Sequence, residues 1–193
     1  MTKCPRYSVI FCLVALCSSS AYAGEIEDRK AAAMKTTKEF GKRLGKEMKA
    51  AMKAGGPTNA IQVCSDKAPE ITGELSRKTG WKVTRVGTKV RNSLLGTPDP
   101  WEQKVLAQFQ ERNKKGEPYK KMAFSEVVKE PNGKYFRFMK AIGVQPMCLQ
   151  CHGGSDTILP EVQMILEERY PHDKAQNYKA GDLRGAISIK QPM

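Results

Sequence analysis

Near the end of the chain, two cysteines and a histidine stand at a spacing that permits a specific chemistry. The string is Pro146-Met147-Cys148-Leu149-Gln150-Cys151-His152-Gly153. Two thiols three positions apart can form thioethers with the two vinyl groups on one edge of a porphyrin, and the histidine that follows can bind the iron. We therefore expect one covalently attached haem c, linked through Cys148 and Cys151, with His152 as an axial ligand.

Two other kinds of site also use a CxxC pair. A redox-active pair of the thioredoxin type normally stands early in a chain, between a first strand and a helix, whereas this pair is late and follows Pro146. A zinc site could be assembled from Cys64, Cys148, Cys151 and one of the two histidines. However, the chain has one CxxC, and the adjacent Cys151 and His152 cannot easily share a metal ion. The spacing favours haem over both alternatives.

The motif leaves the second axial ligand of the iron open. Candidates include Cys64, His172, the methionines and the lysines. Cys64 lies on an apolar stripe, where a thiolate needs a cation to neutralise it, and ferric iron would supply that charge. The alternative is a small buried core residue, which is common for a free cysteine. His172, between a proline and an aspartate, is typical of an exposed turn.

The first 23 residues have the features of an export signal. Lys3 and Arg6 form a basic start, and residues 7–17 supply a short apolar run. Ala21-Tyr22-Ala23 is a small-x-small cleavage site. The apolar run is too short to span a bilayer, so we expect a mature periplasmic chain, beginning at Gly24, without a transmembrane helix. This location agrees with the motif, because haem c is attached outside the cytoplasmic membrane.

Cysteine count and charge are consistent with export. Three of the six cysteines leave with the signal, and an odd number remains, which does not suit a disulfide framework. Loss of Lys3 and Arg6, with no acidic residue, lowers the formal charge from +13 to +11. In an exported protein we expect haem propionates, an acidic partner or a membrane surface to use this charge, and no nucleic acid. The lysines are spread along the sequence, so we expect no compact basic patch.

Hydrophobic periodicity predicts the elements that position these residues. Residues 25–54 predict a long helix that Gly55-Gly56-Pro57 ends, and residues 58–79 predict a second helix with a kink at Pro69. Asp99 and Glu102 predict the start of a further helix through a capping box. The remaining pattern predicts a strand at 81–91, a hairpin of 122–128 and 135–142, a helix at 160–169 and a closing strand at 185–190. The fold class is therefore α+β, a small antiparallel sheet flanked by helices.

Five stretches of the chain, in order, resemble one known family. They are Ala60–Cys64, Lys89–Asn92, Pro98–Glu102, Pro146–Gly153 and Arg184–Ser188, and together they span about residues 57–190. The family is the single-haem c-type proteins with a PAS-like fold, once catalogued as a domain of unknown function. Its members occur as free exported proteins and as sensing parts of bacterial signalling proteins. One departure is Ser93, where the family pattern has a proline.

The resemblance implies a particular ligand set and domain organisation. It implies that His152 and Cys64 are the two axial ligands, and that a long helix precedes a PAS-like antiparallel sheet. The expected organisation is a signal peptide at 1–23, an N-terminal helix at 24–56 and a PAS-like c-type haem domain at 57–193. Arg91 is a reasonable contact for a haem propionate. The alternative is that Arg91 is an ordinary surface arginine.

Three functions are compatible with these features. The first is a redox or small-ligand sensor, in which a weakened thiolate bond opens an axial site to a gas and signals to a protein partner. The alternative is a periplasmic electron-transfer cytochrome c with a redox partner. The third is an enzyme acting on sulfur or nitrogen oxyanions, but the sequence shows no acid–base arrangement around the motif, which disfavours enzymatic activity.

Overall fold

The computed structural model describes the backbone of residues 11–193 and the side chains from residue 22 onward. The helical elements are α1 (Phe11–Gln62), the π-helix η1 (Val63–Lys67), α2 (Ala68–Thr79), α3 (Ser93–Gly96), α4 (Pro100–Lys114), η2 (Tyr119–Lys121), η3 (Pro146–Cys148), α5 (Leu149–His152) and α6 (Pro160–Arg169). The strands are β1 (Lys82–Gly87), β2 (Ala123–Glu130), β3 (Gly133–Gly143) and β4 (Leu183–Pro192). The signal peptide predicted at 1–23 begins in residues that lie outside this description. No helix in the described part of the chain is long and apolar enough to cross a membrane.

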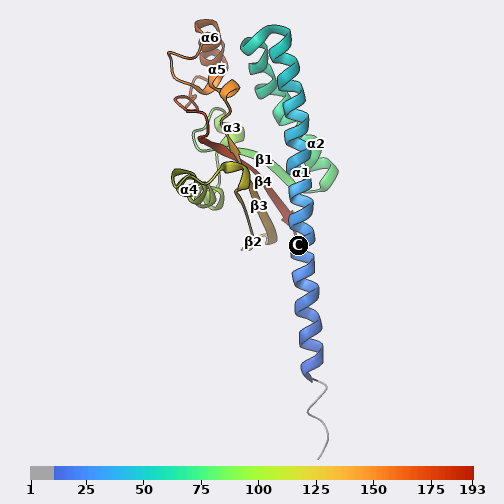
Figure 1. Ribbon diagram of the computed structural model, residues 1–193. Helices are drawn as coiled ribbons and strands as arrows, with labels where there is room; N and C mark the ends of the chain where they lie inside the picture. Colours follow the sequence, from blue (N-terminus) through green and yellow to red (C-terminus); the bar gives the residue numbers. More distant parts are fainter. Residues whose placement is uncertain (1–10) are drawn as a thin grey trace, which may run out of the picture.

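The four strands form one antiparallel sheet in the order β1-β4-β3-β2 (Figure 1). Helices α1 and α2 cover one face of the sheet, and α4 covers the other. Because side chains alternate along a strand, Ile187 and Ile189 of β4 join the core under α1 and α2, whereas Ala186 joins the core under α4. The α+β fold class and the predicted hairpin are confirmed. The finer comparison of this sheet with PAS domains stays a prediction.

The long helix breaks where the sequence predicts. Gly55 and Gly56 have non-helical backbone angles, and Gly56 has a φ of 68° and a ψ of −154°, a conformation that favours glycine. Pro57 then begins the next helical turn, where its missing N–H costs nothing. The chain upstream of the break packs on the sheet through Ala33 and Phe40, and the chain downstream leads to Cys64.

The kink predicted at Pro69 takes the form of a π-helix. The N–H of Ala68 donates to the carbonyl of Val63, five residues back, in place of the usual four. Pro69 has no N–H to donate to Ser65, so the α-helical pattern cannot run through this turn. Short π segments occur frequently at functional sites. Cys64 lies inside this one.

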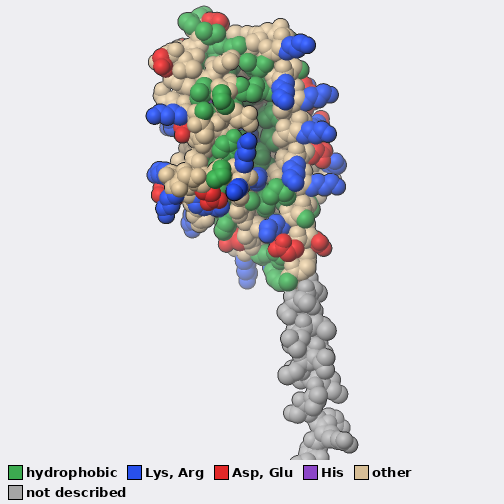
Figure 2. Space-filling model, in the orientation of Figure 1, with side chains coloured by type: hydrophobic (Ala, Val, Ile, Leu, Met, Phe, Trp, Pro, Cys, Tyr) green, Lys and Arg blue, Asp and Glu red, His purple; other side chains and the backbone are tan. Residues whose placement is uncertain are grey.

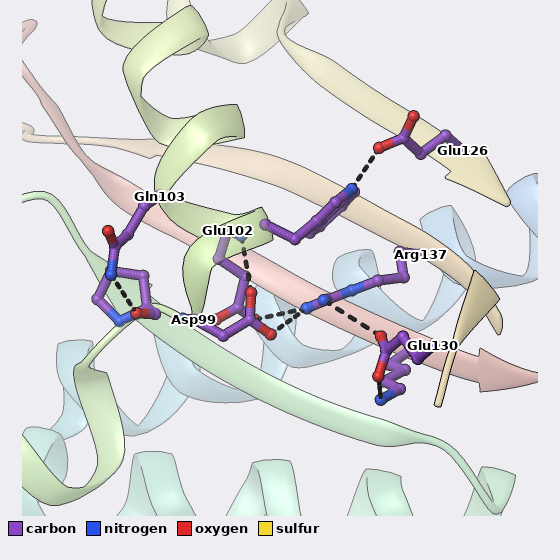
Figure 3. Close-up of polar contacts among 9 residues, drawn as sticks. Asp99, Glu102, Gln103, Glu126, Glu130 and Arg137 are labelled. Atoms are coloured by element: carbon purple, nitrogen blue, oxygen red, sulfur yellow. Dashed lines mark hydrogen bonds and ion pairs between the residues drawn. The ribbon is translucent and has the colours of Figure 1, made fainter. Parts of the chain in front are cut away.

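Helix α4 is fixed to the sheet by a group of charged side chains (Figure 3). Asp99 and Glu102 form the predicted capping box at its start. Arg137 of β3 is 4 % exposed and contacts Asp99 at 2.6 Å, with Glu102 and Glu130 both at 3.5 Å. The guanidinium also lies 4.2 Å from the ring centroid of Trp101. Three carboxylates around one buried cation hold this helix in register with β2 and β3.

Candidate functional site

The CxxCH segment, Cys148–His152, forms two tight helical turns at the upper end of the molecule in Figure 1. Gly153 closes the second turn by donating its N–H to the carbonyl of Leu149 at 2.8 Å. The downstream chain runs alongside, and the N–H of Tyr178 donates to the carbonyl of His152 at 3.0 Å. Both thiols and the imidazole are half-buried. The segment is therefore held through its backbone, which leaves its side chains to react or bind.

A backbone carbonyl orients the imidazole of His152. Its Nδ1 lies 2.7 Å from the carbonyl oxygen of Ala175, and because a carbonyl only accepts, Nδ1 carries the proton. Burial lowers the pKa of His152 well below its usual value, and the positive charges of Arg91, Arg184 and Arg85 lower it further. At neutral pH the ring is therefore neutral, and the lone pair on Nε2 can bind a metal.

Arg91 holds the CxxCH segment to the rest of the domain. Its Nε donates to Asp173 at 2.9 Å, and its Nη2 donates to the carbonyl oxygen of Cys151 at 2.5 Å. Beside it, the N–H of Lys174 donates to the carbonyl of Val90 at 2.9 Å. The structure thus shows Arg91 as a positioning residue for the segment. The propionate contact suggested for Arg91 stays a prediction.

The fold brings Cys64 beside the CxxCH segment. Ile61, one turn before Cys64, is buried in a cluster with side chains of α6, and Cys151 packs against the same cluster. Arg169 of α6 donates to the Oγ of Ser65 at 2.8 Å, which ties the π-helix to α6. Residues some ninety positions apart therefore meet in one place. That Cys64 binds iron stays a prediction.

The thiol of Cys151 lies in a partly buried place beside the other two cysteines. Burial raises the pKa of the Cys151 thiol to about 11, Arg91 lowers it, and the neighbouring Cys64 and Cys148 thiols raise it. At neutral pH this thiol is therefore protonated. Among the side chains that the structure describes, from residue 22 onward, no group of three His, Cys, Asp or Glu residues is placed to hold a metal ion.

His172 and two of the methionines lie in less suitable places for a second axial ligand. His172 is exposed, in a turn where the N–H of Asp173 donates to the carbonyl of Tyr170 at 2.9 Å. Met122 and Met139 are wholly buried in the core under α4. An exposed turn and a closed core suit an axial ligand less well than the half-buried position of Cys64.

Two arginines that the sequence analysis did not single out lie close to His152. Arg184 of β4 donates from Nη1 to the carbonyl of Lys89 at 3.0 Å. It lies over Gly87, where a Cβ atom would be 2.7 Å from this Nη1 atom, so the glycine makes room for the guanidinium. Arg85 stands two residues before Gly87 on β1 and therefore faces the same side of the sheet.

These arginines carry positive charge without a matching carboxylate. Arg91 is paired with Asp173, but Arg85 and Arg184 form no ion pair with any residue in the described range. Burial lowers the pKa of Arg184, and the charges of Arg85 and Arg91 act in the same direction. Unpaired, partly buried guanidinium groups attract anions. The site therefore offers two thiols, a neutral imidazole and an adjacent place for carboxylates.

One local signal for Arg184 was present in the sequence. Gly185, which follows it, has a φ of 155°, and a Cβ atom there would lie 2.0 Å from the carbonyl oxygen of Val86. The close approach of β4 to β1 thus requires glycine, and it turns Arg184 over β1. The sequence of Arg184–Ser188 resembles that of the family. The position of Arg184 over β1, however, depends on the pairing of β4 with β1, which periodicity alone does not reveal.

Hydrophobic side chains gather on the upper half of the face drawn in Figure 2, around a hollow between the α5–α6 region and α1. Several large apolar side chains of the upper region are exposed: Leu94, Leu95, Met147, Leu159 and Met164. A cavity of about 280 Å³ beside the site is lined by Leu166, Tyr170 and Asp173, among others. Exposed apolar surface of this kind commonly marks a place where a ligand or a partner binds.

The fold and the site define an α+β protein with a long leading helix and a late CxxCH segment facing a half-buried cysteine. A family model described as Tll0287-like matches residues 20–192, and the chain belongs to the Tll0287-like family. The family resemblance inferred from the sequence is thereby confirmed.

One solved structure shares the fold. It is described as the crystal structure of the cyanobacterial heme-protein Tll0287, with a TM-score of 0.66 and 23 % sequence identity. The alignment covers 86 % of this chain and 96 % of that chain. No protein with a curated description matches this chain.

Proposed function

We propose that this chain is an exported c-type haem protein that acts as a redox or small-ligand sensor. Cys148 and Cys151 would attach the haem covalently, and His152 and Cys64 would hold its iron. The heme-protein name of the similar solved structure agrees with this proposal. The group would supply an iron centre that changes charge between two redox states and binds small ligands.

The observation that carries the proposal is the hydrogen bond from His152 to Ala175. It fixes the tautomer in which Nε2 has a lone pair, on a ring that burial keeps neutral. A histidine that binds a metal usually donates its other ring N–H to a carbonyl or carboxylate in this way. The high pKa of Cys151 is consistent with a thiol that becomes a thioether and never needs to ionise in the mature protein.

Arg85 and Arg184 are the proposed contacts for the haem propionates. Both lie near His152, and neither has a carboxylate partner in the described part of the chain. Two propionates would neutralise two guanidinium groups, which removes the cost of leaving these cations unpaired. Arg91 keeps its ion pair with Asp173 and positions the backbone of the CxxCH segment.

The position of Cys64 favours a sensor over a carrier. A carrier works best when its ligands stay fixed in both redox states, whereas a sensor needs two states that differ in structure. Cys64 lies in a π-helix, between two helices that meet different parts of the domain. Reduction of a bound iron would weaken its hold on the Cys64 thiolate, and the sulfur could then take up a proton. Release of the thiol would then loosen η1 and pass the change to α1 and α2.

Covalent attachment is tested by mass. Expressed with a c-type maturation system, the protein should gain the mass of one haem and keep it through acid–acetone extraction. Cys148→Ala and Cys151→Ala should each leave one thioether at most, and the double variant should keep none. Cys64→Ala is the matched control, because it removes a thiol outside the motif and should leave attachment intact. Wild-type protein without the added mass, despite competent maturation, would refute the proposal.

Carbon monoxide separates the sensor from the electron-transfer cytochrome c. We expect the oxidised protein to be low-spin, with a weak charge-transfer band to the red that Cys64→Ala removes and Ser65→Ala keeps. The reduced wild-type protein should bind the gas. A reduced protein that ignores carbon monoxide, with fast reversible electron exchange at an electrode, would support the carrier and exclude the sensor.

A further inference from the structure

Six lysines on α1 form a single line along the helix. They are Lys35, Lys38, Lys42, Lys46, Lys49 and Lys53, at successive steps of three or four residues. With 3.6 residues per turn, these steps keep all six within an arc of about 80° and along about 27 Å of the helix. All six side chains are exposed. We call this set the lysine stripe. It corrects the expectation that the lysines form no patch.

The lysine stripe has no counter-charge of its own. None of its six members forms an ion pair or a side-chain hydrogen bond with another described residue. Two acidic residues share this part of the helix: Glu39 lies at the margin of the stripe, about 60° from its centre, and Glu47 lies about 140° from the centre. Glu39 pairs with Lys78 at 3.1 Å, and Glu47 lies toward Lys67. Six exposed ammonium groups therefore lie along one line without an ion-paired carboxylate, and their mutual repulsion is relieved when an anionic surface binds them.

The stripe is on the outer edge of the molecule. Ala33 and Phe40, on the same helix, are buried against the sheet, and the helical period puts them about 170° from the centre of the stripe. Figure 2 shows many Lys and Arg side chains, with some acidic side chains between them, projecting along the edge where α1 and α2 lie. Helix α2 packs beside α1 on the side of Arg43 and Glu47, about 100° or more from the centre of the stripe, so all six charges can reach one flat surface together.

We propose that the lysine stripe binds an anionic lipid surface, with α1 lying parallel to it. A cylinder that rests on a plane touches it along one narrow line, and that line is where the six charges lie. An acidic protein partner normally meets a rounded patch that includes aromatic or aliphatic anchors. The arc of the stripe holds lysines and small residues such as Ala31, with no large apolar side chain, so the helix would bind by charge without inserting.

Vesicle binding of the haem-loaded protein tests this proposal, which is independent of the ligand assignments. The probes are vesicles of phosphatidylcholine alone and of phosphatidylcholine mixed with phosphatidylglycerol. We expect sedimentation with the mixed vesicles at low ionic strength, none with the neutral vesicles, and release by salt. Substitution of all six stripe lysines by glutamine should weaken binding at least about a hundredfold, since each lysine near such a surface contributes about fivefold.

A matched variant distinguishes the stripe from overall charge. It replaces six exposed lysines on other elements by glutamine: Lys82, Lys104, Lys115, Lys120, Lys121 and Lys129. This variant has the same net charge as the stripe variant and should bind the mixed vesicles nearly as well as wild type. Unchanged haem spectra would show that both variants are folded. Equal losses in the two variants, or no wild-type binding, would overturn the proposal. Binding to polyglutamate that needs the stripe, without vesicle binding, would assign the surface to an acidic protein partner.

Discussion

Arg91 and Asp173 form an ion pair of 2.9 Å in which the two side chains are only 9 % and 5 % exposed. A buried pair contributes little net stability while both partners remain, but the loss of one partner leaves an uncompensated charge in the interior. Because Arg91 also holds the carbonyl of Cys151, this pair connects the stability of the domain to the placement of the CxxCH segment.

Asp173→Asn should therefore destabilise the protein strongly. We expect a loss of about 3–5 kcal/mol in the free energy of unfolding, because the Arg91 charge stays buried without its partner. Urea denaturation followed by circular dichroism measures it. Asp156→Asn is the control, since Asp156 is exposed, forms no ion pair among the described residues, and accepts a hydrogen bond from its neighbour Thr157. Equal stability of the two variants would contradict the importance of the buried pair.

His152→Ala should keep the covalent haem and lose its axial ligand. The thioethers do not involve the imidazole, so the added mass should persist, while the spectrum of the oxidised protein changes away from that of wild type. Free imidazole should restore the wild-type spectrum, because it can occupy the space that the ring leaves. His172→Ala, which removes the exposed histidine, should leave the spectrum unchanged. A His152→Ala spectrum identical to wild type would exclude this residue as a ligand.

Arg184→Gln and Arg85→Gln should lower the midpoint potential of the haem. Removal of a positive charge near the iron stabilises the more positively charged oxidised form, by an amount on the order of tens of millivolts. The potential should also become more dependent on pH near neutrality, because a propionate without its arginine has a higher pKa. Lys104→Gln, on the far face of the sheet, is the control. If Lys104→Gln lowers the midpoint potential as much as the two arginine variants do, the shift reflects net charge alone. Arg85 and Arg184 would then not be the propionate contacts.

Asp99 predicts a change of stability in acid. Partial burial would raise the pKa of Asp99, but the hydrogen bonds from Arg137 and from the start of α4 outweigh it, and the net pKa lies below 3.8. A lowered pKa in the folded state contributes stability above pH 3.8, and this contribution is lost as the pH falls through the folded-state value.

Two substitutions at Asp99 separate its charge from its capping role. Asp99→Asn keeps a helix cap and should be less stable than wild type at pH 7, with the difference narrowing below pH 3.8. Asp99→Ala also loses the cap and should cost about 1 kcal/mol more at both pH values. Thermal unfolding at pH 7 and in acid measures both. If the difference in stability between Asp99→Asn and wild type is the same at both pH values, the charge of Asp99 does not contribute to stability.

Features that depend on short stretches of sequence were predictable. The capping box of Asp99 and Glu102, the hairpin of β2 and β3, and the helix break at Gly55-Gly56-Pro57 were all expected and are all present. Each depends on side chains within a few residues of one another, so the pattern carries the information. The CxxCH spacing is local in the same sense.

Features that depend on distant strands were not predictable. Arg85 and Arg184 stand ninety-nine positions apart and meet because β1 pairs with β4, and no period in the sequence reveals that pairing. The burial of Arg91 depends equally on Asp173 from the far end of the chain. The lysine stripe differs, because its spacing of three and four was readable. Lysines that are widely spread along the sequence can still share one face of a helix, and the expectation of no patch did not take their angular positions on the helix into account.

The π-helix has a consequence for the phase of the apolar side chains on either side of it. One extra residue per turn rotates everything after Lys67 by about 100° relative to an uninterrupted α-helix. Ile61, before the extra residue, packs toward α6, whereas Ile71 and Leu75, after it, pack on the sheet. A single apolar stripe thus serves two separate cores. Deletion of one residue between 63 and 67 would bring the two halves back into phase and force one core to lose its contacts, so the turn that carries Cys64 cannot be shortened without loss of packing.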